Sequence, residues 1–292
     1  MVYKTSILSS RSDVIRDTIL FLLGASEDSS LGLWVFIFLK EMKMQDRKID
    51  ISDDLEFDDT QQLQLPWSIK RLVLWLVLYL IISVGSGAPF GFLMAHFNHV
   101  NEWGLTVQDI VIIGQIYLNL FFILAFLAFL IWQCKKVDLS LRQIWGSYAP
   151  QVQYIIFALT YGVLMSLLWN WKVVNFDNIP AKYPDAIFYG YVIVTGLFGP
   201  LIEELYFRGM LYRTLCKRYV ERNAILISAV IFAAYHFQYW LEITNLLFAF
   251  LFGVVAAFLV RRTNSLTASF LFHSIANLVH VVVFQYREFF LL

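Results

Sequence analysis

Residues 187–209 read IFYGYVIVTGLFGPLIEELYFRG. The first sixteen positions contain no charged side chain, which is typical of a helix that enters a lipid bilayer. Three ionisable side chains then follow within six positions: Glu203, Glu204 and Arg208. Each ionisable group inside a membrane helix costs about 2.5–3.5 kcal/mol on insertion scales. We therefore expect these three side chains to have partners or a chemical role.

The spacing within this stretch predicts a local geometry. Glu204 and Arg208 stand four positions apart and would be neighbours on one helix face. Glu203 would point about 100° away from that pair. Pro200 has no backbone N–H, so the sequence predicts a kink just ahead of the acids and a free Gly196 carbonyl.

The composition excludes an ordinary soluble protein. Hydrophobic residues make up 59% of the 292 positions and charged residues 15%, against roughly 45–50% and about 25% in globular chains. Mean hydropathy is +0.65. This apolar surface is too large for the interior of one globule, so lipid must cover part of it. The formal net charge of zero gives no indication of a nucleic-acid partner.

Long apolar runs separated by short polar breaks predict an all-α, polytopic transmembrane bundle of about seven spans, with the functional cavity inside a C-terminal four-helix core. Three parts are expected: an N-terminal segment with an acidic linker (1–69), N-terminal transmembrane helices (70–184) and the C-terminal core (185–292). The expected spans are 72–95, 110–132, 152–169, 187–207, 224–240, 243–260 and 266–284.

The distribution of Lys and Arg predicts an orientation. Only Lys172, Lys182 and Arg287 lie in the breaks of one side, and the alternate breaks carry many more. Because basic residues favour the cytoplasmic side, we expect a multi-pass protein with a cytoplasmic N-terminus. Cys134 and Cys216 would then lie at cytoplasmic ends of spans as reduced thiols. A signal peptide near residues 19–26 is a weaker alternative for the N-terminal segment.

Two later spans carry the complementary polar groups. Phe232 precedes His236 by four positions, and His273 precedes Asn277 by four. Glu203 and His236 lie about equally far, on either side, from a basic turn near residue 220. Antiparallel helices would therefore bring these two side chains to nearly the same depth. A carboxylate and an imidazole at one depth form a pair that can activate water.

These motifs together resemble a known family. The order Glu203-Glu204-x-x-x-Arg208, Phe232-x-x-x-His236 and His273-x-x-x-Asn277 on successive helices resembles the CPBP family. This family comprises CAAX proteases and bacteriocin-processing (Abi) proteins and is related to the Ras-converting CAAX prenyl endopeptidase. The resemblance covers roughly residues 185–285. It implies an intramembrane endopeptidase that acts on membrane-associated or prenylated, CAAX-type substrates.

The resemblance also implies a role for each motif residue. Glu203 with His236 would hold and deprotonate the attacking water. His273 and Asn277 would donate hydrogen bonds to the scissile carbonyl oxygen. Glu204 and Arg208 would form a buried ion pair, with Glu204 also assisting the leaving amine. Phe232 would form a wall of the pocket.

Metal dependence and function remain open at this point. Glu203, His236 and His273 are the residues that would hold zinc. However, the sequence has no HExxH motif, and Asn277 is a poor zinc ligand. A metal-independent, glutamate-type enzyme is therefore favoured over a metalloprotease. The expected partners are membrane lipid and a prenylated or membrane-bound peptide. The alternatives are a non-catalytic immunity or scaffold protein of the same superfamily and a proton-coupled transporter. A transporter would require matching broken helices in two repeated halves, and only the Pro200 break is present.

Overall fold

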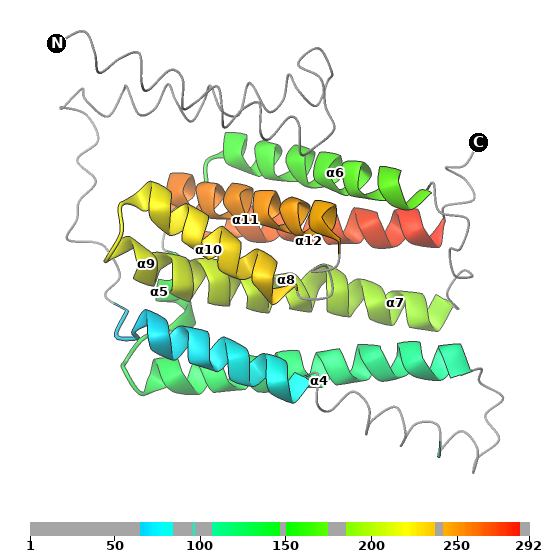
Figure 1. Cartoon of the computed structure of the whole chain (residues 1–292), viewed down its shortest axis with the longest axis horizontal. Coiled ribbons are helices and arrows are strands. Elements are labelled where there is room, and N and C mark those ends of the chain that lie inside the picture. The colour runs from blue at the N-terminus through cyan, green and yellow to red at the C-terminus, as the bar shows by residue number, and fades with distance from the viewer. Residues whose placement is uncertain are drawn as a thin grey trace, which may run out of the picture. The chain divides into compact units, whose positions relative to one another are not determined.

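The computed structural model describes residues 65–83, 96, 107–146, 150–174, 185–236 and 242–286 (Figure 1). All regular structure within these ranges is helical, so the predicted all-α class is confirmed. The acidic linker and the rest of the segment up to residue 64 lie outside the described residues.

The described chain folds as a bundle of helices with short connections. A helix at residues 69–83 comes first. A long, nearly continuous helix, which we call the central rod, runs from Asp185 to Cys216. The other helices are α4 (Val107–Lys135), α5 (Leu141–Trp145), α6 (Val152–Val174), α10 (Glu221–Tyr235), α11 (Ile243–Thr263) and α12 (Leu266–Gln285).

Four of the described helices contain stretches long and apolar enough to cross a membrane: Ile116–Lys135, Val152–Asn170, Ile243–Thr263 and Leu266–Val283. The total of about seven spans is not confirmed and stays a prediction. Half of the residues of the last two spans are buried inside the bundle, against 28% and 22% for the first two. The spans of α11 and α12 therefore contribute more to the core, while those of α4 and α6 expose more apolar surface to lipid.

The central rod changes its helical type along its length. It consists of α7 (Asp185–Ile193), a π-helical turn η2 (Val194–Phe198), α8 (Gly199–Glu203), a second π-helical segment η3 (Glu204–Tyr212) and α9 (Arg213–Cys216). In the first wide turn the Gly199 N–H donates to the Val194 carbonyl, five residues back. Widening gives the Pro200 ring room, so the regular helix is interrupted just ahead of the acids by a π-helical turn.

The helix α10 ends just before His236. His236 adopts a non-helical conformation with φ −82° and ψ 54°, and residues 237–240 of the expected span 224–240 lie outside the described residues. Its Nδ1 lies 2.9 Å from the Phe232 carbonyl oxygen, one of the last carbonyls of α10, which lack intrahelical donors. His236 therefore caps its own helix.

Close helix packing depends on small residues at two contacts. A Cβ at Gly162 of α6 would lie 2.8 Å from the Phe272 carbonyl oxygen of α12. A Cβ at Gly253 of α11 would lie 3.0 Å from the Cα of Ala229 in α10. Small residues let membrane helices approach closely. Figure 1 shows the resulting pairs, α6 beside α12 and α10 beside α11.

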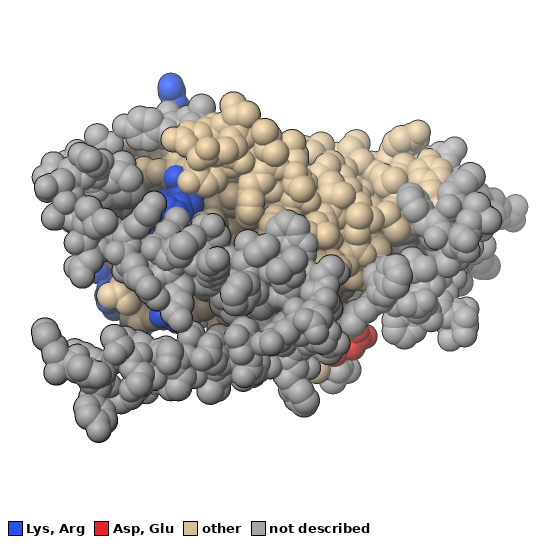
Figure 2. All heavy atoms as spheres, turned by 90° about the horizontal axis from the view of Figure 1, so that it is seen from above, with Lys and Arg blue, Asp and Glu red and all other residues tan. Residues whose placement is uncertain are grey.

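Basic side chains lie toward one end of the bundle. In Figure 2 most described surface is uncharged, and the visible Lys and Arg side chains gather toward the end where α9 meets α10. There Arg261 Nε lies 2.8 Å from Glu221 Oε2, and Lys217 Nζ donates to the Leu65 carbonyl at 2.7 Å. This distribution suits a helix bundle whose middle lies in lipid and whose basic end lies in water.

Candidate active site

Glu204 and Arg208 form the predicted contact at the centre of the bundle. Arg208 NH1 lies 3.0 Å from Glu204 Oε1, and both side chains are fully buried. The second carboxylate oxygen accepts a hydrogen bond from the Ser269 hydroxyl of α12. His273, one turn further along α12, places its Nδ1 2.8 Å from Glu204 Oε1. We call Glu204, Arg208, Ser269 and His273 the ion-pair cluster.

Arg208 also contacts two neighbouring helices. Its NH2 donates to the Gly253 carbonyl of α11 at 3.3 Å. Its guanidinium carbon lies 4.3 Å from the centroid of the Phe232 ring of α10, close enough for a cation–π interaction. A buried charge is tolerated only where such partners replace water. The ion-pair cluster therefore joins the rod, α10, α11 and α12 around one charge pair.

The hydrogen bonds of the two histidines determine their tautomers. The Phe232 carbonyl can only accept, so His236 Nδ1 carries the proton. The Glu204 carboxylate likewise accepts from His273 Nδ1. In the neutral form, each imidazole therefore presents an unprotonated Nε2. Both of these nitrogens face Glu203.

Glu203 differs from its neighbour in having an oxygen without a hydrogen bond. Its Oε2 lies 4.0 Å from His236 Nε2 and 3.8 Å from His273 Nε2. Both distances exceed that of a direct hydrogen bond and suit a bridging water. Within the described residues this oxygen has no hydrogen-bond partner, and 18% of the side chain is exposed. We call Glu203, His236 and His273 the acid–imidazole group.

Asn277 lies one turn beyond His273 and contacts the rod. Its Nδ2 donates to the Thr195 carbonyl at 2.9 Å. In the π-helical register the N–H of residue 200 would bond to this carbonyl, but Pro200 has none. In this wider register Asn277 thus supplies the donor that Pro200 cannot give to Thr195, while the predicted free acceptor was the Gly196 carbonyl. One Asn277 amide hydrogen remains for another acceptor.

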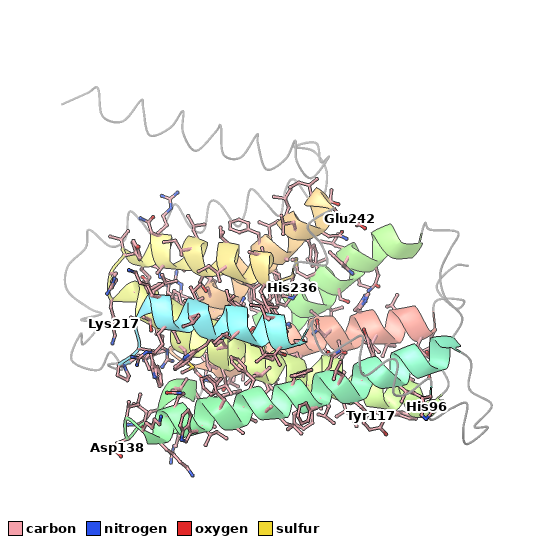
Figure 3. All side chains as sticks on the ribbon, turned by 60° about the horizontal axis from the view of Figure 1, so that its bottom comes forward. His96, Tyr117, Asp138, Lys217, His236 and Glu242 are labelled. Carbon is pink, nitrogen blue, oxygen red and sulfur yellow. The ribbon has the colours of Figure 1, made fainter. Side chains whose placement is uncertain are left out.

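A cavity of about 110 Å³ joins both histidines to Asn277. This volume holds several water molecules. Its walls are mostly aromatic and apolar and include Phe232, as predicted for that residue. The other lining residues are Ser166, Trp169, His236, Phe248, Ala249, Phe252, His273, Ala276, Asn277 and His280. Figure 3 labels His236 and shows it in the interior of the bundle, near the end of the 69–83 helix.

The three residues named for a zinc site have suitable donor types but not a suitable arrangement. Carboxylate and imidazole are common zinc ligands. Among the described residues, however, no group of three or more His, Cys, Asp or Glu side chains is arranged to hold a metal ion. We therefore derive no chemical step through a metal.

The sequence interpretation missed Ser269 and the two tyrosines near Glu203, Tyr79 and Tyr235. Ser269 stands four positions before His273, so the helical periodicity that linked His273 to Asn277 could have identified it. Tyr235 directly precedes His236. Tyr79 carries no local signal, because its contact depends on how a helix distant in sequence packs.

Comparison with known proteins identifies the region that contains the site. A family model described as type II CAAX prenyl endopeptidase Rce1-like matches residues 185–279. No curated protein and no solved structure shows a significant match to the chain. The matched range includes all six predicted site residues. The four helices able to cross a membrane, together with this match, identify the chain as an integral membrane protein. Residues 185–279, which we call the Rce1-like domain, are thus similar to the CAAX protease family that the sequence motifs also resemble.

Proposed function

We propose that this protein is an intramembrane endopeptidase in which Glu203, together with His236 and His273, activates a water molecule. The observation that carries the proposal is the convergence of both Nε2 atoms on Glu203 Oε2, at 4.0 and 3.8 Å. A water between them would donate one hydrogen bond to the carboxylate and one to an imidazole. The Rce1-like domain supports peptide hydrolysis as the reaction.

The proposed reaction needs no group outside the chain except water. Glu203 takes a proton from the water, and the hydroxide oxygen attacks the scissile carbonyl carbon. The oxyanion then accepts a hydrogen bond from the remaining Asn277 amide hydrogen. The Glu204 carboxylate accepts from His273 Nδ1 and so keeps the unprotonated Nε2 of that imidazole toward Glu203 and the water. The proton held by Glu203 passes to the leaving amine, and the carbon–nitrogen bond breaks.

The substrate we propose is a peptide held at the membrane, including prenylated, CAAX-type peptides. Two observations support this class. The family model that matches the domain is named for prenyl endopeptidases. The cavity beside the histidines also has apolar walls, among them Trp169, Phe248 and Phe252, which suit the lipid-soluble part of a substrate better than a charged one.

The deciding experiment is cleavage of a farnesylated CAAX peptide by purified protein in liposomes. Glu203→Gln keeps the size of the side chain and removes the base, so we expect activity to fall by about 10²–10⁴-fold. Glu242→Gln makes the same chemical change at an exposed position and should leave activity unchanged. Full activity of Glu203→Gln would refute the assignment and favour a non-catalytic role.

A chelator series tests metal independence in the same assay. Because the proposed reaction uses only protein groups and water, cleavage should continue in EDTA and in 1,10-phenanthroline. A loss of activity that added zinc restores would overturn the metal-independent mechanism while leaving the peptidase assignment in place.

A further inference from the structure

A tyrosine from outside the Rce1-like domain lies beside Glu203. Tyr79 belongs to the helix at residues 69–83, about 100 positions before the domain begins. Its ring stacks on that of Tyr235, with centroids 6.5 Å apart and an interplanar angle of 27°. Tyr235 in turn contacts His236, with ring centroids 5.2 Å apart.

Glu203 lies between two hollows of different character. The larger cavity is lined by both histidines and Asn277. A second hollow of about 10 Å³, room for about one water molecule, is lined by Glu203 together with Tyr79, Tyr235 and Tyr206. The carboxylate thus has imidazoles near one hollow and phenols around the other.

The 69–83 helix is held firmly enough to place Tyr79. Tyr206 of the rod donates a hydrogen bond to the Leu72 carbonyl. Trp75 packs edge-on against Phe129 of α4 with centroids 5.0 Å apart, and the Tyr79 ring lies 4.8 Å from that of Phe126. A buried phenol normally finds a hydrogen-bond partner, and these contacts allow the partner to be Tyr235.

Counting hydrogens shows what the pair can supply. The two phenols carry two O–H groups, and a hydrogen bond between them would use only one. The second O–H is available to the Glu203 carboxylate, directly or through one water in the small hollow. Hydrogen bonds to charged groups are the stronger ones, contributing about 1.5–3 kcal/mol each.

We propose that Tyr79 and Tyr235 form a hydroxyl pair that positions the Glu203 carboxylate from the side of the small hollow. The N-terminal half of the chain then completes the active site, because Tyr79 lies outside the matched domain. Both tyrosines are positioning residues that act through Glu203. The effect of the two tyrosines on catalysis rests on the proposed function. Their proposed contact with the Glu203 carboxylate is independent of it.

The kinetic test compares tyrosine-to-phenylalanine variants in the liposome assay. Tyr79→Phe and Tyr235→Phe should each lower kcat about tenfold with little change in KM, the smaller end of the range for a hydrogen bond to a charged group. The double variant should be no worse than either single one, because the hydroxyls act as one unit. Tyr212→Phe is the matched control. Its hydroxyl lies 3.4 Å from Glu221 Oε1, away from the site, and its loss should leave kcat unchanged.

An infrared measurement tests the contact without any assay of activity. The carboxylate bands of Glu203 are those lost in Glu203→Gln, and we expect Tyr79→Phe to shift them while Tyr212→Phe does not. If wild type cleaves nothing, the proposed function fails but these bands still decide the present inference. Unshifted bands in both Tyr79→Phe and Tyr235→Phe would overturn it, as would lower stability with unchanged kcat. Should one of the two tyrosine variants fail to fold, the Glu203 bands and the kcat of the other variant test the same proposal.

Discussion

The adjacent carboxylates Glu203 and Glu204 lie in surroundings that contrast at every point. In the ion-pair cluster, both oxygens of Glu204 are hydrogen-bonded and the side chain is fully buried. In the acid–imidazole group, Glu203 Oε2 faces two imidazole nitrogens at 3.8–4.0 Å without bonding to either. Neighbouring positions on one helix thus have opposite hydrogen-bonding states.

This difference indicates a division of labour between the two acids. A carboxylate with both oxygens hydrogen-bonded is held in place and is poorly placed to take a proton from water. One that faces unprotonated nitrogens at 3.8–4.0 Å, where one water can contact both atoms, is suited to that task. His273 belongs to both groups, since its Nδ1 bonds to Glu204 and its Nε2 faces Glu203. The ion-pair cluster therefore orients one of the imidazoles that the chemistry uses.

The largest expected effect comes from removing the cation of the ion-pair cluster. Arg208→Ala leaves the Glu204 carboxylate buried without its counter-charge, which should lower the free energy of unfolding by about 3–5 kcal/mol. Denaturation in mixed detergent micelles measures this loss. The double variant Glu204→Gln/Arg208→Met removes both charges and should regain more than half of it. A double variant as unstable as Arg208→Ala would mean that lost packing, not the unpaired charge, dominates.

Asn277 serves both the proposed chemistry and the structure of the rod, so its variant should change both kcat and stability. Asn277→Ala should lower kcat by about 10²–10³-fold through the lost oxyanion donor. It should also lower stability by about 1 kcal/mol, because the Thr195 carbonyl loses its donor. Pro200→Ala restores a backbone N–H near that carbonyl, so the stability loss should shrink in this background. Unchanged kcat would mean that Asn277 stabilises the fold and takes no part in the reaction.

A smaller effect is expected from the serine that completes the ion-pair cluster. Ser269→Ala removes the hydroxyl that donates to Glu204 Oε2 and should cost about 1.5–3 kcal/mol of stability. Ser274→Ala is the matched control on the same helix, because its buried hydroxyl has no hydrogen-bond partner within the described residues. Its loss should cost almost nothing. Equal losses in the two variants would show that Glu204 does not need the serine.

The contacts that follow from helix geometry were predictable from the sequence. Glu204 and Arg208 are neighbours because four positions make about one turn, and Glu203 meets His236 because both lie about equally far from the turn between their helices. Such predictions need only the rise and twist of a helix. They tolerate the π-helical turns, which shift residues by less than a turn.

The missing parts depend on interactions that no spacing reveals. The end of α10 at Tyr235 is accompanied by a bond from the His236 side chain to the Phe232 carbonyl, which the apolar pattern did not indicate. The carbonyl freed by Pro200 depends on the register that the rod adopts around the ring. Tyr79 reaches Glu203 through the packing of a separate helix, which apolar periodicity does not define.

Cys216 shows a third way to bury an ionisable group, which is to keep it neutral. It lies at the end of the rod, beyond the spans. Burial, with a smaller contribution from the Glu221 charge, raises the pKa of its thiol from 9.0 to about 11 against the opposing influence of Tyr212 and two arginines. The thiolate is the reactive form, so at pH 8 its fraction should be about 100-fold below that of an ordinary thiol.

We therefore expect maleimide to modify Cys216 about 100-fold more slowly than glutathione at pH 8, in a Cys134→Ala background. The rate should rise about tenfold per pH unit until the pH nears 11, because each unit below the pKa reduces the thiolate tenfold. Glu221→Gln should speed the reaction by removing a charge that opposes the thiolate. A rate equal to that of glutathione would show that water reaches the thiol freely. The comparison of environments would then hold only for the carboxylates Glu203 and Glu204.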